Sequence, residues 1–329
     1  MDTMNSDLLL KLRKTDLHLH LDGSVRPATL LELARQQGSG TTQLEAIFRA
    51  PPDGDLKAYL ERFDIVLPLL QTRTALQRAS REILEDCAAN AAMYAEIRFC
   101  PLLHTRDGLP AEEVVEAALE GLAEGRQATG TQARLILCVL HGMDAGQADR
   151  IADLAIAYHR HGVVAVDLAG DEGRGFDLAP FRRAFGRAKA EGLHVTVHAG
   201  EAGPGENVAE AIETLGAERI GHGTRIFGDP KAVELAREHH VGIEVCLKSN
   251  VQTGAVAQLT DHPLRRMLAF GLAATLCTDN LTVSRTGLGE EWLLAARDLA
   301  LTDAELGQIL ANGFAQMFMD DALEPLGSG

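Results

Sequence analysis

Residues 14–24 read KTDLHLHLDGS and place two histidines, His18 and His20, one residue apart within a run of alternating leucines. Along an extended strand, residues i and i+2 point to the same face. The pattern therefore predicts a strand whose leucines face one side and whose two imidazoles lie next to each other on the opposite side. Two neighbouring imidazoles fill an ordinary core poorly, but they are well placed to hold a ligand between two nitrogens.

Seven more short, apolar, β-branched runs occur along the chain, separated by segments with a helical pattern. With the first run they make up eight predicted strands, at residues 15–21, 94–100, 133–140, 163–170, 193–200, 218–223, 241–247 and 272–279. Strands that alternate with helices are typical of parallel sheets, and eight such units in 329 residues predict an α/β fold of the (β/α)8 TIM-barrel type. A doubly wound open sheet is the alternative, but the first strand ends in HLDGS and lacks the Gly-rich turn typical of that fold.

The segment from about residue 28 to residue 93 contains several helical patterns before the second predicted strand. This length predicts a helical insertion after the first strand that caps the mouth of the barrel. The chain has no Pro/Gly/Ser-rich linker, internal repeat or low-complexity tract, so we expect a single domain over residues 1–329.

The composition is that of a globular protein, with 46% hydrophobic and 24% charged residues and a formal net charge of −16. Such an acidic chain is a poor partner for nucleic acid or anionic membranes, because phosphate contacts require clustered Lys and Arg. No apolar segment resembles a signal peptide or a membrane span. Five scattered cysteines without a C-x-x-C pair predict reduced, buried thiols and a cytoplasmic location.

Polar residues that carry chemistry follow the predicted strands, where the catalytic groups of a barrel gather. They are His18, His20, Asp22, His104, His141, Asp167, Gly170, Asp171, Glu172, His198, Glu201, His222, Asp279 and Asn280. The histidine pair of the first strand, with an imidazole and a carboxylate from other strands, predicts a zinc-type metal site with open coordination. His198 and Asp279 are the natural third and fourth ligands.

Two further residues at the strand ends suit acid–base chemistry. Glu201 follows His198 in a tight HAGE turn, where a protonated carboxyl is able to give its proton to a ring nitrogen or leaving group. His222 lies between two glycines that leave room around its ring, and it is placed to orient or deprotonate a water on the metal.

Taken in order, the segments TDLHLHLDGS, FDIVLPLLQTR, VDLAGDE, VHAGE, ERIGHGTRI, SNVQTGAV and TDN resemble the adenosine deaminases of the metal-dependent amidohydrolase superfamily. The resemblance extends from about Leu12 to about Asp320. It implies a (β/α)8 barrel with one Zn²⁺ and hydrolytic deamination of adenosine or 2′-deoxyadenosine at purine C6. The partner is then a small purine nucleoside, and the products are the inosine nucleoside and ammonia.

The resemblance also implies individual roles. His18, His20, His198 and Asp279 match the zinc ligands, and Glu201 matches the residue that protonates purine N1. His222 matches the histidine that positions and deprotonates the zinc water. Gly170 matches the glycine whose N–H meets N3, and Asp22 resembles the contact to the ribose 5′-hydroxyl.

Asn280 departs from many relatives, which carry a second aspartate that faces N7. Purine N7 is an acceptor only, so an aspartate must be protonated to donate to it, whereas an Asn amide donates directly. The exchange is therefore chemically sensible, and we expect Asn280 to bind the purine. His141 stands at an atypical third strand end, and no role is assigned to it.

Three alternatives remain at the level of sequence. The first is a deaminase of another 6-aminopurine, such as 6-aminodeoxyfutalosine or adenine. The second is a metal-dependent ester, lactone or amide hydrolase, although relatives of that kind often bridge two metals with a lysine that the strand VVAVDLAG lacks. The third is a binding protein with a decayed site, which the complete set of polar residues disfavours.

Overall fold

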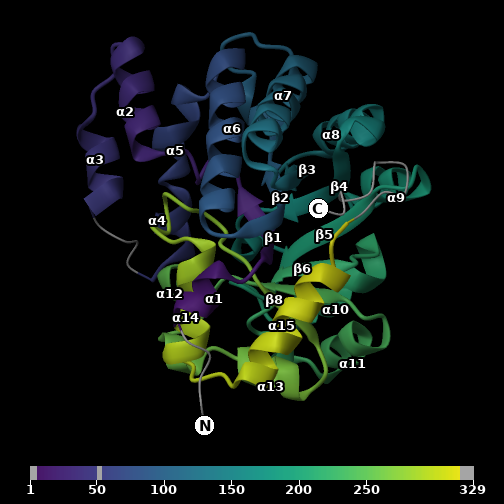
Figure 1. The fold of residues 1–329 in the computed structure, drawn as a ribbon. Coiled ribbons are helices and arrows are strands. Elements are labelled where there is room, and N and C mark those ends of the chain that lie inside the picture. The colour runs from purple at the N-terminus through teal and green to yellow at the C-terminus, as the bar shows by residue number, and fades with distance from the viewer. Residues whose placement is uncertain (1–5, 50–53, 319–329) are drawn as a thin grey trace.

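The computed structural model describes residues 6–49 and 54–318, and eight parallel strands form its centre (Figure 1). Each strand pairs with the next one in chain order, from β1 to β8. The strands are β1 (Lys14–His20), β2 (Ala92–Phe99), β3 (Gln132–Leu140), β4 (Val163–Ala169), β5 (His194–Ala199), β6 (Arg219–His222), β7 (Gly242–Val245) and β8 (Ala273–Leu276). The predicted barrel and its eight strands are confirmed, although several strands are shorter than predicted.

The barrel closes through the residues that follow β8. Asp279 forms a parallel bridge with Leu19, its N–H donates to the carbonyl of His18 at 2.8 Å, and its carbonyl accepts from the N–H of His20 at 2.7 Å. The same backbone hydrogen bonds that join the two ends of the sheet therefore bring three predicted metal ligands together.

Helices surround the strands, as expected for βα units. They are α1 (Ser6–Lys11), α2 (Pro27–Gln36), α3 (Thr42–Arg49), α4 (Leu56–Leu60), α5 (Phe63–Val66), α6 (Arg73–Ala89), α7 (Ala111–Thr129), α8 (Ala145–Tyr158), α9 (Arg182–Ala190), α10 (Glu206–Glu210), α11 (Pro230–Glu238), α12 (Leu247–Gln252), α13 (Leu264–Ala269), α14 (Leu288–Arg297) and α15 (Asp303–Ala315).

The predicted insertion after the first strand is present as α2 to α5, which precede the barrel helix α6. In Figure 1, α2 and α3 stand at one side of the barrel, far from α9 to α11. Tyr59 of α4 and Phe63 of α5 reach the cavity at the mouth of the barrel. The insertion therefore supplies part of the wall of that cavity, which agrees with the capping role predicted for it.

The three leucines of the first strand are fully buried, but they do not all join the same cluster. Leu19 and Leu21 belong to the large core that includes the helices, whereas Leu17 packs with Tyr94, Cys246 and Cys277. The expectation that all three leucines share one face of the strand is therefore too simple. The pairing register of β1 with β2 shifts between Asp16 and Leu19, and such an irregularity breaks strict alternation.

The inside of the barrel contains a network of buried ion pairs. The Arg98 guanidinium contacts Asp167 at 3.1 Å and Glu244 at 2.9 Å, and Arg219 contacts Glu244 at 2.6 Å and also pairs with Glu96. None of these side chains is exposed. Buried charges are tolerated when each is paired and hydrogen-bonded, and these pairs form a rigid base beneath the predicted site.

Among the described residues, no helix is long and apolar enough to cross a membrane. All five cysteines are buried and free, as predicted.

Candidate active site

A cavity of about 500 Å³ opens at the C-terminal ends of the strands. Its wall includes eight of the nine predicted site residues, namely His20, Asp22, Gly170, His198, Glu201, His222, Asp279 and Asn280. The ninth, His18, is fully buried and lies next to His20. Residues separated by as many as 262 positions in sequence thus meet around one space.

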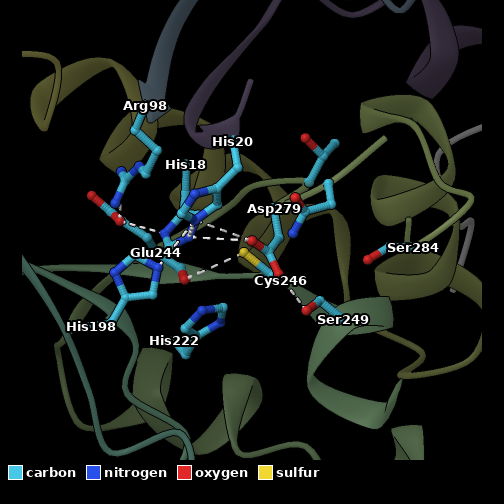
Figure 2. Close-up of polar contacts among 12 residues, drawn as sticks. His18, His20, Arg98, His198, His222, Glu244, Cys246, Ser249, Asp279 and Ser284 are labelled. Carbon is cyan, nitrogen blue, oxygen red and sulfur yellow. Dashed lines mark hydrogen bonds and ion pairs between the residues drawn. The ribbon is translucent and has the colours of Figure 1, made fainter. Parts of the chain in front are cut away.

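The four predicted metal ligands converge at the base of this cavity (Figure 2). The Nε2 atom of His20 lies 3.2 Å from Nε2 of His18 and 3.2 Å from Nε2 of His198. The Oδ1 atom of Asp279 is 3.5 Å from His18 Nε2 and 3.4 Å from His20 Nε2. Donor atoms bound to one zinc ion lie about 3.3–3.4 Å apart, and these four spacings are close to that value. The ligand atoms of His18, His20 and Asp279 lie within 4.8 Å of one another, and those of His18, His198 and His222 form a second such group.

The remaining ring nitrogens show why these atoms face one another. His18 Nδ1 lies 2.7 Å from Glu244 Oε2, and His198 Nδ1 lies 3.2 Å from Asp167 Oδ1. A neutral imidazole that donates its one N–H to a carboxylate presents a lone pair at Nε2. Two such lone pairs, beside a third imidazole and a carboxylate oxygen, make up a set of donors that a cation between them stabilises. The donor set therefore fits a bound metal ion, and the outer carboxylates orient its ligands.

Backbone conformation also shapes the site. His222 and Asp279 have φ values of 66° and 63°, in the left-handed region that residues other than glycine rarely adopt. Such backbone strain costs about 1–3 kcal/mol and is typical of functional sites. Gly221 is required for packing, since a Cβ at this position would lie 2.9 Å from His18 Cε1 and 3.2 Å from His198 Cγ. The room next to His222 that the GHG sequence predicts is therefore filled by two of the predicted metal ligands.

Glu201 is a buried carboxyl beside His222. Burial, together with the nearby charge of Asp279, raises the pKa of Glu201 to about 8. The Thr253 hydroxyl donates to Glu201 Oε1 at 2.9 Å, which leaves Oε2 to carry the acidic proton. Glu201 is thus a carboxylic acid at neutral pH, as a proton donor requires.

A chain of hydrogen bonds determines which nitrogen of His222 carries a proton. The N–H of Leu264 donates to His262 Nδ1 at 3.1 Å, so His262 Nε2 is the donor to Asn250 Oδ1, also at 3.1 Å. The Asn250 amide then donates to His222 Nδ1 at 2.9 Å. Burial lowers the pKa of His222 well below its usual value, so its ring is neutral. Its proton is therefore on Nε2, which lies 3.6 Å from Glu201 Oε2.

The turn that carries Glu201 is held by another carboxylate, Glu172. Its side chain accepts the backbone N–H groups of Gly200, Glu201 and Ala202 at 3.0, 2.5 and 2.6 Å, and the Asn207 amide at 2.9 Å. The sequence marks Glu172 as a residue at a strand end but does not reveal this role. Only the fold shows that the loops after β4 and β5 meet.

Asn280 lies in the cavity wall and is held by a tyrosine of the insertion. Its Nδ2 donates to the Tyr59 hydroxyl at 2.7 Å, and that hydroxyl also contacts Ser284 Oγ at 2.7 Å and Asp279 Oδ2 at 3.3 Å. Gly23 packs directly against Asn280, because a Cβ on Gly23 would lie 1.7 Å from Asn280 Oδ1. Sequence reasoning missed Tyr59, which no motif connects with the end of the eighth strand.

Three other predicted strand-end residues also occupy the cavity wall. Asp22 Oδ1 lies 2.9 Å from His104 Nε2, and Gly170 has a φ of 96°, which favours glycine. The His141 ring packs against Phe176, with ring centroids 5.4 Å apart.

The family model described as adenosine deaminase matches residues 13–324. An adenosine deaminase from Haemophilus ducreyi is 40% identical over 317 residues, which cover 93% of this chain and 92% of that protein.

Solved structures agree with this similarity. An adenine deaminase from Arthrobacter aurescens has a TM-score of 0.86 and 30% identity, covering 94% of each chain. An amidohydrolase from Burkholderia ambifaria with bound Zn has a TM-score of 0.88 and 26% identity, covering 98% of this chain and 90% of the other.

Proposed function

The chain belongs to the adenosine deaminase family, and on that premise we propose that it hydrolyses adenosine and 2′-deoxyadenosine at purine C6. The reaction places the oxygen of water on C6 and releases ammonia. We include in the proposal that the protein acts in the cytoplasm as a single domain.

The observation that carries this proposal is a buried glutamate, Glu201, in the cavity at whose base the side chains of the four proposed metal ligands converge. Glu201, with its pKa raised to about 8, gives its proton to purine N1 and makes C6 more electrophilic. A pKa near the working pH suits such a proton donor.

We propose that His18, His20, His198 and Asp279 hold one Zn²⁺, whose contribution when bound is to activate water near neutral pH. His222 has its proton on Nε2, so it acts toward the attacking oxygen as a hydrogen-bond donor. Of the two roles open from sequence, orienting that oxygen therefore fits better than deprotonating it.

Other wall residues bind the purine nucleoside. Gly170 meets N3 through its backbone N–H, the Asn280 amide faces N7, and Asp22 accepts the 5′-hydroxyl of the ribose. A free adenine would leave the Asp22 end of the cavity unused, and this favours nucleosides over adenine.

The charge of the wall disfavours nucleotides. Away from the metal ligands and Glu201, the charged residues that line the cavity are Asp22, Lys57, Glu61, Asp64, Arg106 and Asp171. Four carboxylates face two cations, and Lys57 lies 3.9 Å from Glu61. An acidic wall opposes the entry of a phosphate.

A substrate panel tests this proposal. The purified, zinc-loaded protein is assayed with adenosine, 2′-deoxyadenosine, adenine, AMP and 6-aminodeoxyfutalosine by the change in purine absorbance. We expect kcat/KM for the two nucleosides to exceed that for adenine and AMP by at least about 10²-fold, since each lost polar contact costs about 1–3 kcal/mol. A preference for adenine, the reported substrate of the Arthrobacter relative, would overturn the nucleoside assignment, and turnover of none would overturn the deaminase reaction on these purines.

A further inference from the structure

His104 lies behind Asp22, at the end of the short helix η2 (Pro101–His104), and its side chain is completely buried. Its ring packs against Phe99, with the ring centroids 5.4 Å apart. Its Nδ1 lies 2.9 Å from the carbonyl oxygen of Leu70, and its Nε2 lies 2.9 Å from Asp22 Oδ1. The imidazole therefore connects the insertion to the cavity wall.

The direction of the hydrogen bond between His104 and Leu70 follows from the chemistry of the two partners. A carbonyl oxygen only accepts, so His104 Nδ1 carries a hydrogen and donates it to Leu70. Nε2 and Asp22 Oδ1 are both buried and lie 2.9 Å apart, and neither atom forms a hydrogen bond with a residue of the ranges 6–49 and 54–318. This 2.9 Å contact between a fully buried ring nitrogen and Oδ1 fixes the side of the Asp22 carboxyl group that faces His104.

The position of His104 is itself fixed from two sides. Gln71, next to Leu70, donates from Nε2 to the Leu103 carbonyl at 3.0 Å, and its Oε1 accepts the N–H of Arg106 at 2.9 Å. The loop after β2 and the end of the insertion are thereby joined around the imidazole. This side chain does not adapt freely, so it sets the orientation of its partner.

Asp22 lines the cavity while its Oδ1 is engaged by His104. The other oxygen, Oδ2, is then the atom left to accept a hydrogen bond from a substrate. A carboxylate oxygen selects a donor such as a hydroxyl group, and it repels a phosphate, which offers only acceptors and negative charge at neutral pH.

We propose that His104 is a positioning residue that makes the cavity specific for a nucleoside with a free 5′-hydroxyl, because it holds Asp22 ready to accept that group. This inference rests on the proposed function. It assigns to His104 no contact with the reacting atoms.

A comparison of two protein variants on two substrates tests the inference. Wild type and His104→Leu are compared on adenosine and on 5′-deoxyadenosine, which lacks only the hydroxyl in question. A hydrogen bond to a charged group is worth about 1.5–3 kcal/mol, so we expect His104→Leu to lose about 10–100-fold in kcat/KM on adenosine, mainly through KM. On 5′-deoxyadenosine we expect a loss below about threefold.

Two variants serve as comparisons. His104→Gln, whose amide is able to donate to Asp22, should recover part of the loss on adenosine. His161→Leu makes the same exchange at an exposed histidine, and it should leave kcat/KM unchanged for both substrates.

Equal losses on both substrates for His104→Leu and His104→Gln would overturn the inference, since His104 would then support only the fold. No loss on adenosine would overturn it as well. A wild-type protein that deaminates neither nucleoside would instead refute the proposed function itself, so the two failures are distinguishable.

Discussion

The half of the site that we propose binds the metal and the half that we propose faces the substrate are built differently. His18, His20 and His198 lie within strands, and Asp279 forms the bridge that closes the barrel. Asp22, Gly170, Glu201 and Asn280 all follow strand ends. The three histidines proposed as metal ligands lie in strands, and two of them contact carboxylates inside the barrel, whereas the residues proposed to bind substrate depend on side chains of neighbouring loops.

Because the two halves are held by different residues, a substitution in one half should have a different effect from a substitution in the other. Glu244 and Asp167 hold the ligand rings from below through the buried ion network. Glu172, His104 and Tyr59 hold the substrate residues from the side. Damage to the first half should remove the metal, and damage to the second should leave the metal in place while it impairs turnover or binding.

The largest effect is expected for His18→Ala. This variant removes one of four metal-binding atoms and leaves Glu244 without its imidazole partner. Metal content measured by elemental analysis should fall from one equivalent toward zero, and kcat/KM should fall at least about 10⁴-fold, because a catalytic metal contributes several kcal/mol. His239→Ala, at an exposed position, is the control and should retain both. Unchanged zinc content in His18→Ala would refute the ligand assignment.

The second largest effect is expected for Glu201→Gln, which separates the two halves. The amide is nearly the same size as the acid but is a poor proton donor, so turnover should fall about 10³-fold. Because Glu201 is not a proposed metal ligand, zinc content and melting temperature should stay close to wild type. Near-normal turnover would show that proton donation comes from another group.

The sequence alone predicts much of the half of the site that we propose binds the metal. The spacing of His18 and His20 places both imidazoles on one face of a strand, and the ends of the other apolar runs supply His198 and Asp279. Strand periodicity thus predicts that the imidazoles of His18 and His20 lie together, and the expected position of the other strand ends adds His198 and Asp279.

The supporting residues were not predictable in the same way. Glu244 lies in an ordinary strand sequence and meets His18 across 226 positions only when the barrel closes. Tyr59 reaches Asn280 from an insertion whose path no pattern specifies. The hydrogen-bond network of His262, Asn250 and His222 depends on contacts within loops. Residue periodicity does not predict such contacts.

Glu172→Gln tests whether the loop contacts place the proton donor. Its carboxylate accepts four N–H groups, and an amide would turn an N–H toward some of these donors. A shift of about 1 Å in a catalytic group costs about 10²-fold, so we expect a loss of roughly that size in kcat with full zinc content. Glu206→Gln, exposed in the same region, is the matched control. Loss of zinc in Glu172→Gln would mean that the two halves are coupled more tightly than their contacts indicate.

A smaller effect is expected from pH in the wild-type protein. Burial raises the pKa of Glu201 to about 8, and the acid must be protonated to act. Activity should therefore be nearly constant below that pKa and fall as pH rises through it, by about tenfold for each further unit. The kcat/KM profile for adenosine between pH 6 and pH 10 measures this, and a profile still level at pH 10 would contradict the assignment of Glu201 as the acid.

The smallest effect is expected for Asn280→Asp. This variant tests whether residue 280 contacts purine N7. Position 280 is buried next to Asp279, so a new carboxyl there has a raised pKa for two reasons, burial and the neighbouring charge. When protonated it donates to purine N7 as the amide does, and when ionised it repels the N7 lone pair. We therefore expect kcat/KM a few-fold below wild type at neutral pH and a recovery as the pH falls by about one to two units. Asn280→Ala, which does not titrate, should be slower at every pH without a change in the shape of the profile. If Asn280→Asp and the wild type share one profile, residue 280 does not contact N7, and the Tyr59–Asn280 pair supports the wall without binding the purine.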